Sequence, residues 1–205
     1  MLPVITIARQ YGSGGHEVGE KLAQKLGIPY YDKALIAMAA KQSGLSEEVF
    51  EHADEKATSS LLYSMVVGGY GFGSRIPGLN EMPINDKLFL IQSDIIKKAA
   101  EEGSCVIVGR CADYILREFP NALNVFIHAD KASRVQRIVA KGLCEEKKAP
   151  DFVSKKDKQR ANYYNFYSNN RWDDLNNYDF TLDTSKFTIE EAVELVADAA
   201  RRLDK

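Results

Sequence analysis

One stretch decides the fold of this chain: Pro3-Val-Ile-Thr-Ile-Ala8 runs into Arg9-Gln-Tyr-Gly-Ser-Gly-Gly15. The apolar run predicts a buried strand, and the spacing of apolar residues predicts a helix from about His16 to Leu26. Glycines between strand and helix leave backbone N–H groups bare, and the helix N-terminus adds partial positive charge. We therefore predict a phosphate-binding turn. An ordinary tight strand-to-helix turn, which glycine serves equally well, is the alternative.

The turn departs from the pattern G-x-x-x-x-G-K-[ST] of P-loop nucleotide-binding proteins. His16 and Glu17 stand where the lysine and the hydroxyl residue should follow the last glycine. The lysine of that pattern neutralises the β and γ phosphates, and the hydroxyl holds Mg²⁺. Arg9 could supply the missing cation because a guanidinium suits phosphate oxygens, whereas His16 is a weaker substitute.

The composition favours an intracellular enzyme. The net charge of −2 argues against nonspecific nucleic-acid binding as the main task. We expect neither a membrane span nor a leader sequence, because no apolar run is long enough and no signal-peptide pattern opens the chain. Cys105, Cys111 and Cys144 lack metal-like spacing, so we expect reduced thiols and a cytoplasmic location.

Strand and helix patterns alternate along the chain. Further strands are predicted near residues 28–32, 105–109, 124–129 and 180–183, and Thr188 and Glu191 form a capping box before the last helix. This order predicts an α/β fold in which a parallel sheet is covered by helices on both faces. We expect one domain over residues 1–205.

The segment from about 43 to 86 breaks this alternation. It contains a predicted helix pair and then, over residues 68–78, glycines interleaved with aromatic residues. Such a loop suits either a mobile flap over a ligand or an ordered surface excursion.

Basic residues outnumber acidic ones between Asp130 and Arg160, although the whole chain is slightly negative. Arg134 and Arg137 share a helix face at positions i and i+3, and Arg160 follows the loop 143–150. These arginines could close over phosphates from the side opposite the glycine turn. A solvated basic face is the alternative.

Together these motifs resemble the cytidylate kinase-like family of P-loop nucleoside monophosphate kinases. The resemblance covers nearly the whole chain. It includes the glycine turn with Tyr31-Asp32-Lys33, then Gly109-Arg110, Ser133-Arg134 with Arg137, Asp157 with Arg160, Tyr163-Tyr164, and Tyr178-Asp179. The turn and the paired tyrosines are more similar to the divergent, kinase-like branch than to true cytidylate kinases.

The resemblance implies a three-layer P-loop NTPase fold with five parallel strands, a lid at about 141–160, and transfer of the γ-phosphate of ATP with Mg²⁺. It also implies roles for individual residues. Donor phosphates would be wrapped by Gly12, Ser13, Gly14 and Gly15 next to His16; Arg134, Arg137 and Arg160 would act as lid arginines beside Arg9; and Asp32, Lys33 and Arg110 would meet the acceptor.

Some residues depart from active cytidylate kinases. Cys111 stands where those enzymes have an aspartate that touches the acceptor sugar, and Met38 replaces a phosphate-binding arginine. Cytosine selectivity is therefore poorly supported. Mg²⁺ would depend on Glu17, Asp32 or the substrate phosphates, which suits an ion that keeps most of its waters.

Three functions follow as hypotheses. The first is a small-molecule kinase, in particular a nucleoside monophosphate kinase whose acceptor is CMP, dCMP or a similar small compound. The second is a nucleotide-binding regulatory protein with weak or no kinase activity. The third, dinucleotide binding, is disfavoured because Glu17 occupies a position that needs a small residue. We expect a nucleotide as small-molecule partner and neither nucleic acid nor membrane. A homodimer stays an open alternative.

Overall fold

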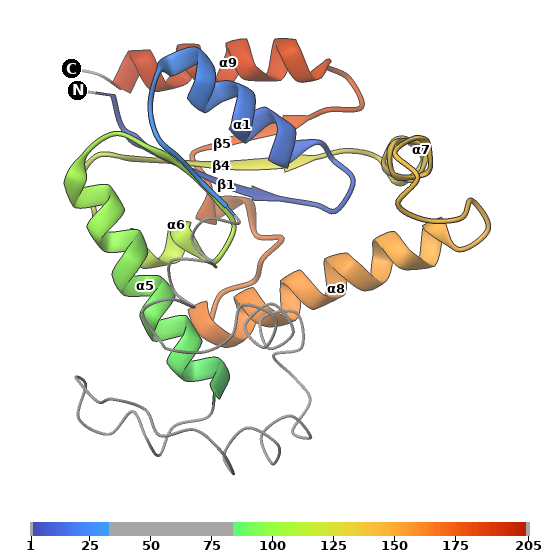
Figure 1. Cartoon of the computed structure of the whole chain (residues 1–205), viewed down its shortest axis with the longest axis horizontal. Helices are drawn as coiled ribbons and strands as arrows, with labels where there is room; N and C mark the ends of the chain where they lie inside the picture. Colours follow the sequence, from blue (N-terminus) through green and yellow to red (C-terminus); the bar gives the residue numbers. More distant parts are fainter. Residues whose placement is uncertain (1, 33–83, 204–205) are drawn as a thin grey trace.

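A computed structural model describes residues 2–32 and 84–203 of the chain. Within these ranges five strands form one parallel sheet in the order β2-β3-β1-β4-β5 (Figure 1). The strands are β1 (Val4–Arg9), β2 (Tyr30–Tyr31), β3 (Val106–Val108), β4 (Ala122–His128) and β5 (Phe180–Asp183). The predicted parallel α/β sheet is thereby confirmed.

Helices cover both faces of the sheet (Figure 1). One face carries α1 (Gly15–Leu26) and α9 (Ile189–Leu203), where Leu22 and Val196 join Ile5 in a core from which water is excluded. The other face carries α5 (Ile84–Glu102), α6 (Ala112–Ile115) and α8 (Ala149–Ser168), and here Ile96 packs with Ile107. Successive residues of a strand point to opposite faces, so the apolar run of β1 serves both cores.

The carboxyl ends of the parallel strands lie at one edge of the sheet, where ligands enter open α/β folds. At this edge β4 continues into α7 (Lys131–Ala140), and α8 then runs back beneath the sheet (Figure 1). A short 3-10 helix, η2 (Leu175–Asn177), precedes β5. This edge brings together the glycine turn after β1, the turn after β3 and one side of α8.

The predicted elements agree with the structure in kind, with shifts at their ends. The first helix begins at Gly15 rather than His16, and β4 begins at Ala122. The predicted capping box is present, because Thr188 N donates to Glu191 Oε2 at 2.8 Å and Glu191 N donates to Thr188 Oγ1 at 3.2 Å.

The excursion predicted at 43–86 falls mostly outside the described residues, and Lys33 and Met38 lie outside them too; residues 84–86 belong to α5. No helix in the described part of the chain is long and apolar enough to cross a membrane.

Candidate functional site

The glycine turn leaves donors free at its helical end. In the described residues, no protein acceptor pairs with the N–H groups of Gly14, Gly15 or His16. The first N–H groups of a helix have no partner within the helix, and here they follow a turn in which Gly12 and Gly14 have positive φ. Such converging N–H groups at a helix N-terminus form an anion-binding site.

The carbonyl groups of the same turn are held by the protein. Five successive carbonyl oxygens, from residue 9 to residue 13, accept hydrogen bonds: Arg9 from Arg160 (2.8 Å), Gln10 from the Ser13 hydroxyl (2.8 Å), Tyr11 from Arg134 (3.3 Å), Gly12 from Arg137 (2.6 Å) and Ser13 from the Thr184 hydroxyl (2.5 Å). The turn is therefore fixed by its acceptors, while its last N–H groups remain available to a ligand.

Arg134 and Arg137 approach the turn from α7. Arg134 is buried, and it also donates to the Ala129 carbonyl at 3.0 Å and pairs with Asp157 of α8. Arg137 bridges Gly12 to the carbonyl of Thr184, 3.2 Å from Nη2. Both guanidinium groups thus support the turn through its backbone. Their contact with transferred phosphate stays a prediction.

The segment expected to act as a lid, about 141–160, consists of the connection after α7 and the first part of α8. It is packed onto α7, because Val153 and Ala149 are buried with Ile138. It is also joined to the glycine turn, since the Asp157 carboxylate accepts from Tyr11 N at 2.7 Å.

The Arg9 side chain lies beside the turn, inside the protein. A β-carbon at Gly15 would lie 2.6 Å from Arg9 Cβ, so Arg9 fills the space into which a side chain at the first helical residue would extend. A β-carbon at Gly109 would lie 2.0 Å from Arg9 Nη1, so only glycine leaves room for the guanidinium there. Arg9 Nε is buried without a hydrogen-bond partner. Burial lowers the pKa of Arg9, an effect that Asp32 partly opposes.

Asp32 fits an interaction with a metal or its waters better than Glu17 does. The Asp32 carboxylate is nearly buried, 2.9 Å from His16 Nε2 and 3.9 Å from Arg9 Nη2. Glu17 instead forms ion pairs with Lys141 at 3.0 Å and Lys21 at 3.1 Å, and these hydrogen bonds lower its pKa. No group of three or more His, Cys, Asp or Glu side chains in the described ranges could hold a metal ion. A metal would depend on Asp32 and on ligand oxygens.

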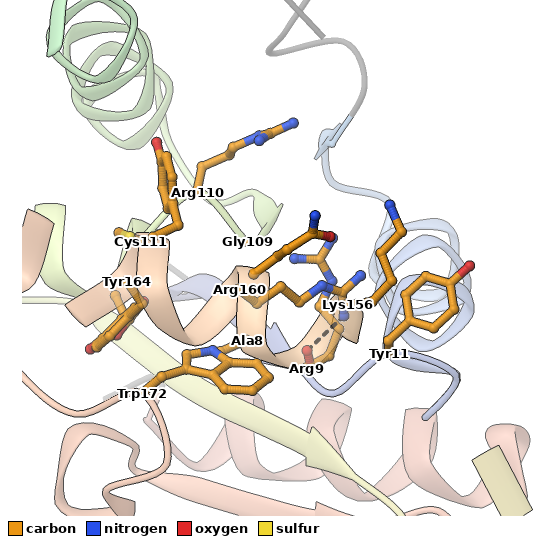
Figure 2. A pocket seen from close by; sticks show the side chains of 13 residues that line it. Ala8, Arg9, Tyr11, Gly109, Arg110, Cys111, Lys156, Arg160, Tyr164 and Trp172 are labelled. Atoms are coloured by element: carbon orange, nitrogen blue, oxygen red, sulfur yellow. Dashed lines mark hydrogen bonds between the residues drawn. The ribbon is translucent and has the colours of Figure 1, made fainter. Parts of the chain in front are cut away.

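A pocket of about 230 Å³ opens next to the turn, between the carboxyl ends of the strands and α8 (Figure 2). In Figure 2, Arg9, Arg160 and Lys156 gather at one side, Cys111 and Tyr164 lie at the other, and Trp172 and Ala8 lie below. The lining residues are Ala8, Arg9, Tyr11, Gly109, Arg110, Cys111, Asp113, Lys156, Gln159, Arg160, Tyr163, Tyr164 and Trp172. Four of these residues are basic and one is acidic, so the pocket suits an anion.

Burial disfavours the charged form of the arginines in this pocket. It lowers the pKa of Arg110, and it lowers that of Arg160 to about 9, with repulsion from Arg9 as a second cause. A buried charge is stabilised when an opposite charge comes close to it. An anionic ligand in the pocket would therefore interact favourably with several guanidinium groups at once.

The turn after β3 has an unusual backbone. Gly109, Arg110 and Cys111 are three successive residues with positive φ, at 84°, 61° and 55°. In residues other than glycine this conformation costs about 1–2 kcal/mol each and occurs often at functional sites. Here it sets Arg110 in the wall of the pocket and starts α6 at Ala112.

The structure brings most of the predicted site residues to one edge of the sheet. Arg9, Arg110 and Arg160 share the pocket, and the glycine turn adjoins it through Arg9 and Tyr11. Sequence reasoning missed Asp113, Trp172 and Thr184. The paired tyrosines at 163 and 164 were a partial signal, since both line the pocket.

Comparison with known proteins agrees with this geometry. A sequence model of the cytidylate kinase-like family matches residues 4–186. The chain belongs to the cytidylate kinase-like family. It is 24% identical over 203 residues to the cytidylate kinase of Pyrococcus horikoshii, covering 98% of this chain and 90% of that protein.

Solved structures share the fold of this cytidylate kinase-like protein. An uncharacterized protein from Eubacterium ventriosum matches with a TM-score of 0.70 and 29% identity, covering 97% of this chain and 98% of that one. Shikimate kinase from Bacteroides thetaiotaomicron matches with a TM-score of 0.57 and 14% identity over the same shares of the two chains. These similarities confirm the α/β P-loop kinase fold expected from the sequence.

Proposed function

We propose that this protein transfers the γ-phosphoryl group of ATP to a nucleoside monophosphate or a similar small anionic acceptor. The observation that carries the proposal is the position of the basic pocket directly beside the anion-binding turn, with Arg9 and Tyr11 in its lining. Phosphoryl transfer needs two anionic reactants held side by side, and it proceeds by positioning and charge stabilisation rather than by a covalent intermediate.

In the proposed reaction, the N–H groups of Gly14, Gly15 and His16 bind the donor phosphates. Arg9 lies beside the first residue of α1, and we assign it the role of the missing P-loop lysine. An acceptor oxygen attacks the γ-phosphorus, the bond from that phosphorus to the β–γ bridging oxygen breaks, and ADP leaves. Arg160 and Arg110 stabilise the negative charge, since both line the pocket.

Among the described residues, Mg²⁺ would be held by Asp32 together with the nucleotide's own oxygens, as an ion that retains its waters allows. Mg²⁺ bound with ATP would supply further neutralisation of phosphate charge. Arg134 and Arg137 act in this proposal as positioning residues of the turn. A cytoplasmic location, the absence of nucleic-acid and membrane partners, and a homodimer stay predictions.

One observation favours a second function. His16 and Glu17 stand where a P-loop has its lysine and its hydroxyl residue, and His16 Nε2 lies 2.9 Å from the Asp32 carboxylate. A protein without those two groups can bind a nucleotide and yet transfer phosphate slowly. The alternative is therefore a nucleotide-binding regulatory protein.

A coupled ADP-release assay with Mg-ATP and a panel of nucleoside monophosphates and small hydroxylated metabolites tests the proposal. ATP binding is measured in parallel by calorimetry. Turnover with one acceptor supports the kinase. Tight ATP binding without turnover against any acceptor supports the regulatory protein.

A further inference from the structure

Among the described residues that line the pocket, Asp113 is the one acidic side chain. It is only 7% exposed, and its Oδ2 accepts a hydrogen bond from the Tyr164 hydroxyl at 2.6 Å. Burial raises the pKa of Asp113 to about 6, which the bond from Tyr164 partly opposes. A buried carboxylate with a single side-chain donor is stabilised by further donors.

The surroundings of Asp113 are rigid. Tyr164 is buried, and Tyr178, packed on the same aromatic cluster, donates through its hydroxyl to the Trp172 carbonyl at 2.9 Å. In this pocket wall the Asp113 carboxylate is thus paired with the Tyr164 hydroxyl, and Trp172 is held through its backbone carbonyl. Groups held in this way recognise a ligand without reorganising.

The pocket consequently combines two chemistries. Arg9, Arg110 and Arg160 favour negative charge, whereas Asp113 accepts hydrogen bonds and disfavours a carbonyl or carboxylate opposite it. A ligand that is anionic throughout would satisfy the arginines and oppose Asp113. A ligand with an anionic group and a separate O–H or N–H donor would satisfy both.

We propose that Asp113 is a specificity residue that accepts a hydrogen bond from a hydroxyl or amino group of the anionic acceptor. This inference rests on the proposed function, because it assigns the pocket to the phosphoryl acceptor. It narrows the acceptor to compounds that carry a phosphate or carboxylate together with a hydrogen-bond donor on another part of the molecule.

The test measures binding by calorimetry with defined probes, independently of turnover. In the pair CMP and UMP the 4-amino donor of CMP is replaced by a carbonyl oxygen in UMP, whose N3 also carries a proton. The pair CMP and dCMP differs by the 2′-hydroxyl, and inorganic phosphate reports on the arginines alone. We expect wild-type protein to prefer the donor-bearing member of at least one pair by about 10-fold or more, as a hydrogen bond to a charged group allows. The pair that shows the preference identifies the recognised group.

Asp113→Asn is the decisive variant because its amide oxygen can still accept from Tyr164 while its amide nitrogen faces the ligand as a donor. We expect the preference to vanish or reverse, with phosphate affinity unchanged or increased. Lys158→Ala is the control, since Lys158 is exposed on α8 and does not line the pocket, so this variant should retain the preference.

Three results overturn the inference: no preference or no binding in the wild type, an unchanged preference in Asp113→Asn, or an equal loss of affinity for phosphate and all nucleotides in that variant. The last result would indicate a role in folding only. ADP release is assayed separately. If the ligand preference depends on Asp113 but no ADP is released, Asp113 keeps its role in ligand recognition and the proposed phosphoryl transfer is refuted.

Discussion

Arg137 Nη1 lies 2.6 Å from the carbonyl oxygen of Gly12, and its other nitrogen, Nη2, lies 3.2 Å from the carbonyl of Thr184. One guanidinium group therefore joins the glycine turn after β1 to the residue that follows β5. Because Thr184 also donates its hydroxyl to Ser13, the turn is tied to the sheet on two sides. This arrangement makes the shape of the turn depend on residues more than 100 positions away.

Arg137→Ala should destabilise the fold by about 1–3 kcal/mol, because two carbonyl groups lose a charged donor. Urea denaturation monitored by circular dichroism measures the change in the free energy of unfolding. Arg171→Ala is the control: Arg171 is exposed and paired only with nearby Asp173, so its removal should leave the midpoint unchanged. Equal midpoints for Arg137→Ala and the wild type would show that the turn holds its shape without this link.

Arg9→Ala should weaken ATP binding by at least about tenfold, whereas His16→Ala should have a small effect. Arg9 is a buried cation beside the turn with an unpaired Nε, while the His16 side chain is about half exposed and already paired with Asp32. Calorimetric titration of both variants with ATP compares the dissociation constants. Equal ATP affinity in the two variants would remove Arg9 from the role of the missing lysine.

Arg160→Ala should lower kcat by about 100-fold with a smaller change in KM, because its charge acts on the transferred group. The loss of its hydrogen bond to the Arg9 carbonyl should leave the helical circular dichroism signal intact. Lys158→Ala lies on the same helix but is exposed, so its kcat should equal that of the wild type. An unchanged kcat in Arg160→Ala would replace the lid assignment of this part of α8 with a solvated basic face.

Asp113→Asn should stabilise the protein at neutral pH and not at pH 4. Burial raises the pKa of Asp113 from 3.8 to about 6, so ionising this carboxyl in the folded state costs about 3 kcal/mol. Above pH 6 this cost lowers the stability of the wild type in full, because Asp113 is then ionised in the folded state. Between pH 6 and pH 4 the folded state binds the extra proton, so the wild type gains stability as the pH falls.

Denaturation at pH 4, 5, 6 and 7 measures the difference in unfolding free energy between the wild type and Asp113→Asn. The contributions of the other carboxyl groups cancel in this difference because both proteins contain them. Tyr164, Cys111 and Tyr178 interact with Asp113, and their raised pKa values keep them protonated over this range. A difference in unfolding free energy that does not vary with pH would contradict the buried ionised state of Asp113.

The sequence predicted the sheet well because local signals determine it. The apolar run of β1, the glycines of the turn and the Thr188 and Glu191 cap each depend on neighbours within a few residues, and each has the predicted form. The shortness of β2, only Tyr30–Tyr31, was not predictable, because an edge strand extends only as far as β3 pairs with it.

The site was less predictable because its contacts join distant segments. Arg134 and Arg137 do share a face of α7, as their spacing indicated, but that spacing could not reveal that this face meets the carbonyl groups of residues 11 and 12. Asp113 belongs to no motif. It reaches the pocket after a turn in which Arg110 and Cys111 adopt positive φ, a conformation that cannot be predicted from these residue types.

Helix α8 contributes Asp157 and Arg160 to the glycine turn, and Gln159, Tyr163 and Tyr164 to the pocket. Under the proposed function, nucleotide binding and acceptor choice would therefore depend on residues of one helix. In relatives that phosphorylate different acceptors, we expect the residues at positions 159 and 163 to differ according to the acceptor. The residues at positions 157 and 160 should differ only where the sequence of the glycine turn differs too. Swapping α8 between such relatives would exchange acceptor preference only when the four residues before Ser13 are exchanged with it.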